Sequence, residues 1–144
     1  MISTLKKRYA MGLAPAGLGF LFLALAGPGL GLELGAVPPP APYLPGALFS
    51  LALAFSLGGP VVVRTLFAHG RRHDSHTPGD LFLAFQTRLI LTALPAPYFT
   101  LAALVWEIPR FHAAGMLLAA LYGLYYQYPS RARIQGDRKI FKVP

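Results

Sequence analysis

The chain has 144 residues, of which 55% are hydrophobic and only 12% charged, and it contains no cysteine. A water-soluble domain with so few polar side chains could not cover its surface, so the composition predicts an integral membrane protein. The absence of cysteine excludes disulfides, thiolate metal sites and thiol nucleophiles. The net charge of +8 would suit nucleic acid, but the basic residues cluster beside apolar runs, as membrane topology signals do. We therefore expect no nucleic-acid partner.

The first apolar segment follows the basic residues Lys6, Lys7 and Arg8. The uncharged run over residues 9–32 is long enough to cross a hydrocarbon core of about 30 Å. A signal peptide is the alternative, because a basic start, an apolar run and the triplet Ala24-Leu25-Ala26 resemble a cleavable leader. The apolar run is longer than an ordinary signal core, so we expect it to be retained as a membrane span.

The predicted fold is an all-α integral membrane protein, a four-transmembrane-helix bundle forming one domain over residues 1–144. The expected spans and connections are 10–33, 46–63, 80–106 and 111–128, with an outer proline-rich loop at 34–45, a cytoplasmic loop at 64–79 and a basic tail at 129–144. Within the spans, Gly58-Gly59-Pro60 predicts a kink or local unwinding, and Pro95 and Pro97 predict a bend, because proline removes a helical hydrogen bond. The tail is expected to lie against anionic headgroups or to be solvated.

Charge asymmetry predicts the orientation. Only Arg110 lies on one side of the predicted membrane, and Arg88 lies inside it. The other lysines and arginines lie on the opposite side: Lys6, Lys7, Arg8, Arg64, Arg71, Arg72, Arg131, Arg133, Arg138, Lys139 and Lys142. By the positive-inside rule, the N- and C-termini are cytoplasmic, and we expect a multi-pass protein of a prokaryotic plasma (inner) membrane.

Small residues recur every fourth position in two of the spans. Gly27 and Gly31 do so near the outer end of the first span, and Gly115, Ala119 and Gly123 do so along the fourth. Such rows let helix backbones approach closely in lipid. We expect the two rows to touch, either within one chain or across the interface of a homo-oligomer.

Arg88 is the principal candidate for function. Thr77 is the expected N-cap of the third span, with Asp80 in its first turn, which places Arg88 about 12 Å inside the membrane. A central arginine costs on the order of 2.5–3.5 kcal/mol in lipid. We therefore expect it to face the bundle interior and bind a lipid phosphate, a small anion or a carboxylate, with Gln86 and Thr92 as polar neighbours. The alternative is an arginine that extends to the inner phosphates or pairs with an aspartate.

The second candidate site is a group of three histidines, His69, His73 and His76. Their spacing would place two imidazoles on one helix face and bring the third close, as a metal site requires. The pattern resembles one histidine box of the membrane fatty-acid desaturases and hydroxylases. Those enzymes assemble about eight histidines, whereas this chain has four, so a plain polar loop is the alternative.

The chain shows no serine nucleophile motif, no glycine-rich phosphate loop and no close pair of acids. We therefore expect a non-enzymatic membrane protein without a cofactor, acting as a small transport or channel-type unit or as a lipid-binding unit around Arg88. The expected partners are membrane lipids and further copies of the chain or a larger membrane complex. The alternatives are an accessory subunit of such a complex and a metalloenzyme that uses the three histidines.

Overall fold

The computed structural model describes residues 1–30, 35 and 37–143. Over these residues the chain is built from helices and contains no β-strand; a single bridge joins Val37 to Trp106. The all-α fold class predicted from the sequence is confirmed. The elements in chain order are α1 (Ile2–Leu25), the 3-10 turn η1 (Pro28–Leu30), α2 (Leu44–Leu53), the π-helical turn η2 (Ala54–Gly58), α3 (Gly59–Gly70), α4 (Gly79–Ala93), α5 (Pro95–Ala103), α6 (Arg110–Gln127) and α7 (Arg131–Ile140).

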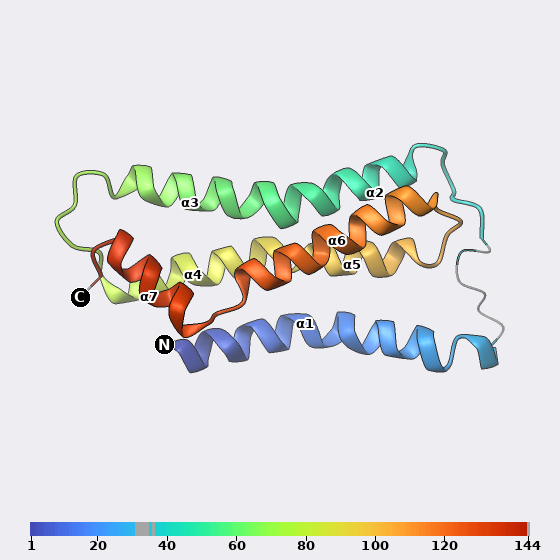
Figure 1. Cartoon of the computed structure of the whole chain (residues 1–144), viewed down its shortest axis with the longest axis horizontal. Helices are drawn as coiled ribbons and strands as arrows, with labels where there is room; N and C mark the ends of the chain where they lie inside the picture. Colours follow the sequence, from blue (N-terminus) through green and yellow to red (C-terminus); the bar gives the residue numbers. More distant parts are fainter. Residues whose placement is uncertain (31–34, 36, 144) are drawn as a thin grey trace.

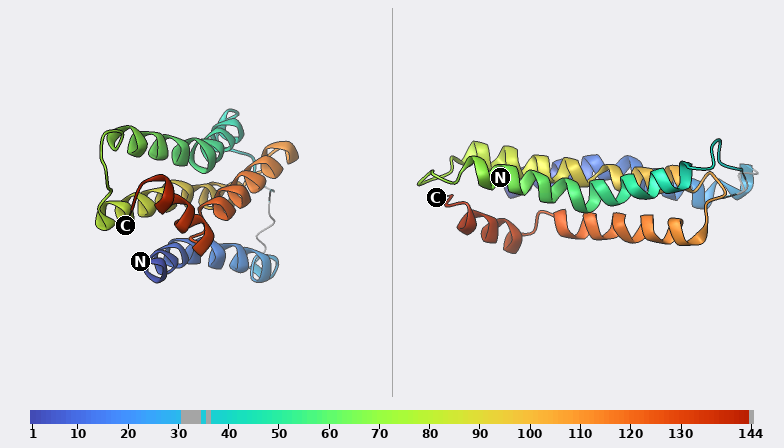
Figure 2. Two further views of the ribbon diagram at one scale, coloured as in Figure 1. Left: turned by 60° about the vertical axis from the view of Figure 1, so that its left-hand side comes forward. Right: turned by 90° about the horizontal axis from the view of Figure 1, so that it is seen from above.

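The helices run side by side as long antiparallel rods (Figure 1). The rods are α1, the continuous α2–η2–α3, the α4–α5 pair and α6, and the short helix α7 turns back at the end where α3 stops and α4 begins. Seen from above, α6 and α7 lie to one side of the other rods (Figure 2). The N-terminus therefore shares one end of the molecule with the α3–α4 turn and α7.

Two of the helical segments have the length and composition needed to cross a membrane. They are Ile2–Leu25, with 24 residues, and Leu44–Gly70, with 27 residues. The first of these packs mainly against α4 and α5, and the Tyr9 hydroxyl also donates to the Leu124 carbonyl of α6 at 3.0 Å. Its large apolar side chains, including Leu18, Phe22 and Leu25, are exposed, as expected of a helix surrounded by lipid.

The rods depart from regular α-helical geometry next to prolines. The irregularity predicted at Gly58-Gly59-Pro60 is a π-helical turn, which immediately precedes the proline-containing start of α3. Proline cannot donate a backbone hydrogen bond, and one extra residue per turn accommodates that loss. At Pro95, where a bend was predicted, the helix is interrupted: α4 ends at Ala93 and α5 begins with Pro95 itself.

Several predicted boundaries were wrong. Helix α3 continues to Gly70, so Arg64 lies within a helix rather than in the predicted loop 64–79. Thr77 is buried and is not the N-cap of α4; its backbone N–H donates to the carbonyl of Lys142 at 3.2 Å, and Pro78 precedes the helix. The predicted basic tail contains α7, whose first turn is capped by the Ser130 hydroxyl.

The hydrophobic core consists of two clusters. The larger lies at the end that contains α7, where the Phe67 and Phe85 rings stack with centroids 4.1 Å apart. Its buried members are Leu5, Phe82, Phe85, Leu89, Ile90, Leu94, Ile134 and Phe141. The smaller cluster joins α2, α5 and α6 through Leu48, Ala52, Ala103 and Met116. The space between the rods is thus filled by side chains at both ends.

The small-residue rows pack differently from the prediction. Gly115 lies against the ring of Phe49 and Gly123 against Ser56, so with the buried Ala119 this face of α6 packs on α2 and η2. The predicted contact with the first span within the chain is therefore wrong. Gly27 is buried near the end of α1, and Gly31 lies outside the described residues. The predicted contact between two chains remains a prediction.

A Cβ atom added at Gly123 would lie 2.9 Å from the Ser56 Cβ and 3.2 Å from its Cα, whereas one added at Gly17 would meet nothing within 4 Å. Gly123→Ala should therefore lower the free energy of unfolding by about 1–3 kcal/mol through overpacking. The matched change Gly17→Ala should raise it by up to about 1 kcal/mol through helix propensity. Unfolding in mixed detergent–SDS micelles measures both, and equal stabilisation by the two changes would contradict the packing described here.

Candidate functional site

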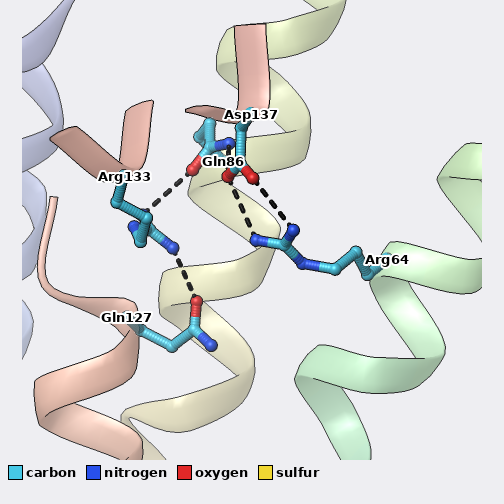
Figure 3. Close-up of polar contacts among 5 residues, drawn as sticks. All are labelled: Arg64, Gln86, Gln127, Arg133 and Asp137. Carbon is cyan, nitrogen blue, oxygen red and sulfur yellow. Dashed lines mark hydrogen bonds and ion pairs between the residues drawn. The ribbon is translucent and has the colours of Figure 1, made fainter. Parts of the chain in front are cut away.

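Five polar side chains from four helices meet at the end of the bundle that contains α7 (Figure 3). They form the polar network, whose members are Arg64 from α3, Gln86 from α4, Gln127 from α6, and Arg133 and Asp137 from α7. Gln86 is fully buried, and Gln127 and Asp137 are nearly so. Polar groups placed this deeply must be hydrogen-bonded to one another, because burial without a partner is costly.

Asp137 is the centre of the polar network. Its two carboxylate oxygens accept hydrogen bonds from the two terminal nitrogens of Arg64, at 2.9 and 3.1 Å. The amide nitrogen of Gln86 donates to the same carboxylate at 2.7 Å. The Asp137 side chain is 4% exposed and that of Arg64 is 39% exposed. The carboxylate is therefore enclosed in protein, whereas the guanidinium that it binds in a two-pronged geometry also reaches the surface.

Arg133 occupies the other half of the polar network. It donates to Gln127 Oε1 at 2.8 Å and to Gln86 Oε1 at 3.0 Å. Its Nε is buried and has no hydrogen-bond partner among the described residues. Burial lowers the pKa of Arg133 below its ordinary value, the Asp137 carboxylate raises it, and the nearby Arg64 lowers it again. An arginine remains protonated through such changes, so the polar network carries two positive charges and one negative charge.

The local sequence of α7 explains this placement. Ser130 accepts a hydrogen bond from the backbone N–H of Arg133 at 3.2 Å and fixes the start of the helix. Ile134 and Phe141, which are buried in the larger core cluster, hold one face of α7 against the rods. Asp137 lies one turn after Ile134 on that face. These apolar contacts fix the position of α7 and so place the Asp137 carboxylate beside the guanidinium of Arg64.

An open groove of about 450 Å³, which we call the α3–α6 groove, reaches the polar network from the outside of the bundle. It exists because α2 and η2 pack against α6, whereas α3 packs mainly against α4. Leu57, Pro60 and Val61 line one wall of the groove. Tyr122 and Tyr126, whose rings stack with centroids 4.3 Å apart, line the other.

The charged end of the α3–α6 groove is formed by Arg64, Arg133 and Asp137. A guanidinium presents several N–H donors in a plane and binds the paired oxygens of a phosphate or carboxylate. The rest of the lining is mostly apolar or aromatic, with Ser56 and Gln127 as the remaining polar residues. This combination suits an amphiphile with an anionic head and an apolar tail, rather than a small ion that would need to be surrounded by polar groups.

The predicted ligand set around Arg88 does not come together. Arg88 is exposed, so its predicted orientation toward the bundle interior is wrong; the interior polar residue of α4 is Gln86, two positions earlier. The Thr92 hydroxyl donates to the carbonyl of Leu89 within its own helix, at 2.9 Å. Asp80 is exposed in the first turn of α4. Only Gln86 belongs to the polar network.

The predicted histidine site is not formed either. His69 lies in the last turn of α3, and His73 and His76 lie in the connection to α4, all with exposed side chains. Over the described part of the chain, which includes all three, no group of three His, Cys, Asp or Glu side chains is arranged to hold a metal ion. The geometry therefore gives no support to a metalloenzyme.

Sequence reasoning missed the charged members of the polar network, because Arg64 and Arg133 were counted as orientation signals. One signal was available in the tail. Asp137 is the sole acid in the basic stretch 129–144, and it lies three residues after Ile134 and four before Phe141. That spacing puts the acid on the apolar side of an amphipathic helix, where it requires a buried cation.

Comparison of this chain with known protein families, with characterised proteins and with solved structures found no match. The functional argument therefore depends on the geometry of this chain alone.

The enclosed position of Asp137 leads to a test of the polar network. Asp137→Asn should lower the free energy of unfolding by about 1–3 kcal/mol, because it removes the charge that Arg64 and Gln86 bind. Trypsin should then cleave α7 faster. The matched change Asp74→Asn disrupts a more exposed pair with Arg71, at 2.5 Å, and should cost less than about 1 kcal/mol. Similar protease resistance in both variants would mean that Asp137 does not hold α7 in place.

Proposed function

We propose that this protein is a four-span membrane protein that binds an anionic lipid in the α3–α6 groove, with both of its termini in the cytoplasm. The observation that carries the proposal is a pair of arginines, of which a single carboxylate offsets only one, at one end of a groove with largely apolar walls. The lipid phosphate would lie beside Arg64 and Arg133, and an acyl chain would lie along Leu57 and Val61.

The distribution of charge along the rods supports the membrane orientation. The N-terminal lysines, the turn after α3 and the basic helix α7 lie at one end of the molecule (Figure 1). Arg110 begins α6 at the opposite end. The excess of positive charge at one end is the pattern by which a cytoplasmic face is recognised.

The charge balance of the polar network supports an anionic ligand. Asp137 offsets one of the two guanidiniums, which leaves one positive charge in excess where protein and lipid would surround it. An uncompensated charge in such surroundings is costly. Because Arg64 is 39% exposed, its outer edge can donate to a phosphate without displacing Asp137.

The position of the free space favours lipid binding over conduction. The described interior of the bundle is filled by Phe82, Phe85, Leu89 and Met116, whereas the α3–α6 groove lies on the outside. A lipid can enter such a groove laterally from the bilayer. A transport or channel-type unit and an accessory subunit remain predictions from the sequence, with no specific feature of the fold in their favour.

Native mass spectrometry of the detergent-purified protein with phosphatidylglycerol tests the proposal. Val61→Trp should fill the α3–α6 groove without altering the polar network, since Val61 is exposed on its wall. Arg64→Met removes the accessible cation, and each change should weaken retention of the lipid in this groove about tenfold. Arg131→Met removes the same charge from an exposed position of α7 and should have no effect. Unchanged retention in Val61→Trp would overturn the proposal.

The orientation has its own test, which the absence of cysteine makes simple. Ser75→Cys, in the turn after α3, should react with a membrane-impermeant maleimide only after the cells are permeabilised. Tyr43→Cys, at the opposite end before α2 and with a parent side chain 74% exposed, should react in intact cells. The reverse pattern would place the basic end outside and contradict the proposed topology.

A further inference from the structure

A second groove lies between α3 and α4, and we propose that it binds a separate anionic phospholipid through Arg88. This α3–α4 groove has a volume of about 300 Å³ and is lined by Arg88, by Arg71 and by apolar side chains. The proposal rests on the membrane position of α4, which is part of the proposed function. It does not depend on occupation of the α3–α6 groove.

Arg88 is the residue of the α3–α4 groove that would bind the lipid phosphate. It is exposed, and it has no hydrogen-bond or ion-pair partner among the described residues. Helix α4 begins at Gly79, so the helical rise places Arg88 about 13 Å along the rod. A positive charge beside apolar side chains that face lipid is costly to leave without a partner, and an anion bound to it offsets part of that cost.

The direction of the side chain fits a lipid headgroup. Side chains of an α-helix lean toward its N-terminus, and the N-terminus of α4 lies at the end with the α3–α4 turn (Figure 1). The guanidinium of Arg88 therefore extends toward the interface, as long cationic side chains do. The α3–α4 groove continues to Gly70 and Arg71 at the end of α3, which connects Arg88 to the level of the headgroups.

The walls of the α3–α4 groove are suited to an acyl chain. Phe67 and Phe85 lie along it, and Leu66 and Leu81 are exposed at its sides. At the headgroup end, Asp74 already pairs with one nitrogen of Arg71 at 2.5 Å, which neutralises that arginine. The groove is left with one uncompensated cation, Arg88, and this charge matches a phosphate diester that carries a single negative charge.

A second copy of the chain is a poorer occupant. Asp74 and Asp80 lie at the interfacial end of the rods, Glu107 lies near the start of α6 at the other end, and Asp137 is enclosed in the polar network. Among the described acids, none lies on a surface at the depth of Arg88. A lipid of the adjacent leaflet brings its phosphate to the mouth of the groove without such a residue.

Native mass spectrometry with phosphatidylglycerol tests this inference by counting tightly held lipids. Wild-type protein should retain two, and Arg88→Gln should retain one. Leu66→Trp should also retain one, because it fills the α3–α4 groove without removing a charge. Arg72→Gln, an exposed arginine in the neighbouring turn that does not line this groove, should retain two, and the zwitterionic phosphatidylcholine should not be held at either position.

The combined variants separate the two proposals. Val61→Trp with Arg88→Gln should retain no lipid. Loss of one lipid in Val61→Trp but none in Arg88→Gln or Leu66→Trp would overturn the Arg88 site and leave the proposed function standing. Loss of one lipid in Arg88→Gln and in Leu66→Trp, but none in Val61→Trp, would overturn lipid binding in the α3–α6 groove and leave the Arg88 site standing. Equal retention of phosphatidylcholine in the α3–α4 groove would also overturn the inference, because Arg88 would then not select an anion.

Discussion

The ion pair between Asp137 and Arg64 is the contact on which the α7 end of the bundle depends. It joins a helix rich in arginine and lysine to the α2–α3 rod, and Gln86 extends it to α4 through a hydrogen bond of 2.7 Å. Without the carboxylate, two guanidiniums would face each other in a partly buried position and would repel the helix that carries one of them. The apolar contacts of Ile134 and Phe141 and the ion pair therefore stabilise the same docked position of α7.

The π-helical turn at Ala54–Gly58 gives this end of the bundle its shape. The helix α2 and the turn itself pack closely on α6, where Gly115 leaves room for Phe49 of α2 and Gly123 for Ser56 of the turn. After the turn, α3 follows α4 instead. This change of partner opens one groove between α3 and α6 and exposes the other side of α3 along a second groove with α4. A local backbone irregularity next to Pro60 thus determines where the arginines are accessible from outside the bundle.

The sequence predicts the class of this fold well and its polar site poorly, and the reason is physical. Composition and proline positions report local properties, so the helical class, the irregularity before Pro60 and the break at Pro95 follow from them. Three of the pairings in the polar network join residues 47 to 73 positions apart: Arg133 with Gln86, Gln86 with Asp137, and Asp137 with Arg64. No local pattern encodes which side of α4 faces inward, and an error of two residues exchanges the buried Gln86 for the exposed Arg88.

The charge balance is the same in the two grooves on either side of α3. In the α3–α6 groove, Asp137 offsets one of two arginines; in the α3–α4 groove, Asp74 offsets Arg71 and leaves Arg88. Each groove thus has one positive charge in excess beside an apolar wall. A headgroup with one negative charge brings either groove to neutrality, whereas a doubly charged headgroup would bring in a second charge without a partner, and burying it is costly. Both grooves are therefore expected to prefer phosphatidylglycerol, a singly charged diester, to a lipid with a terminal phosphate.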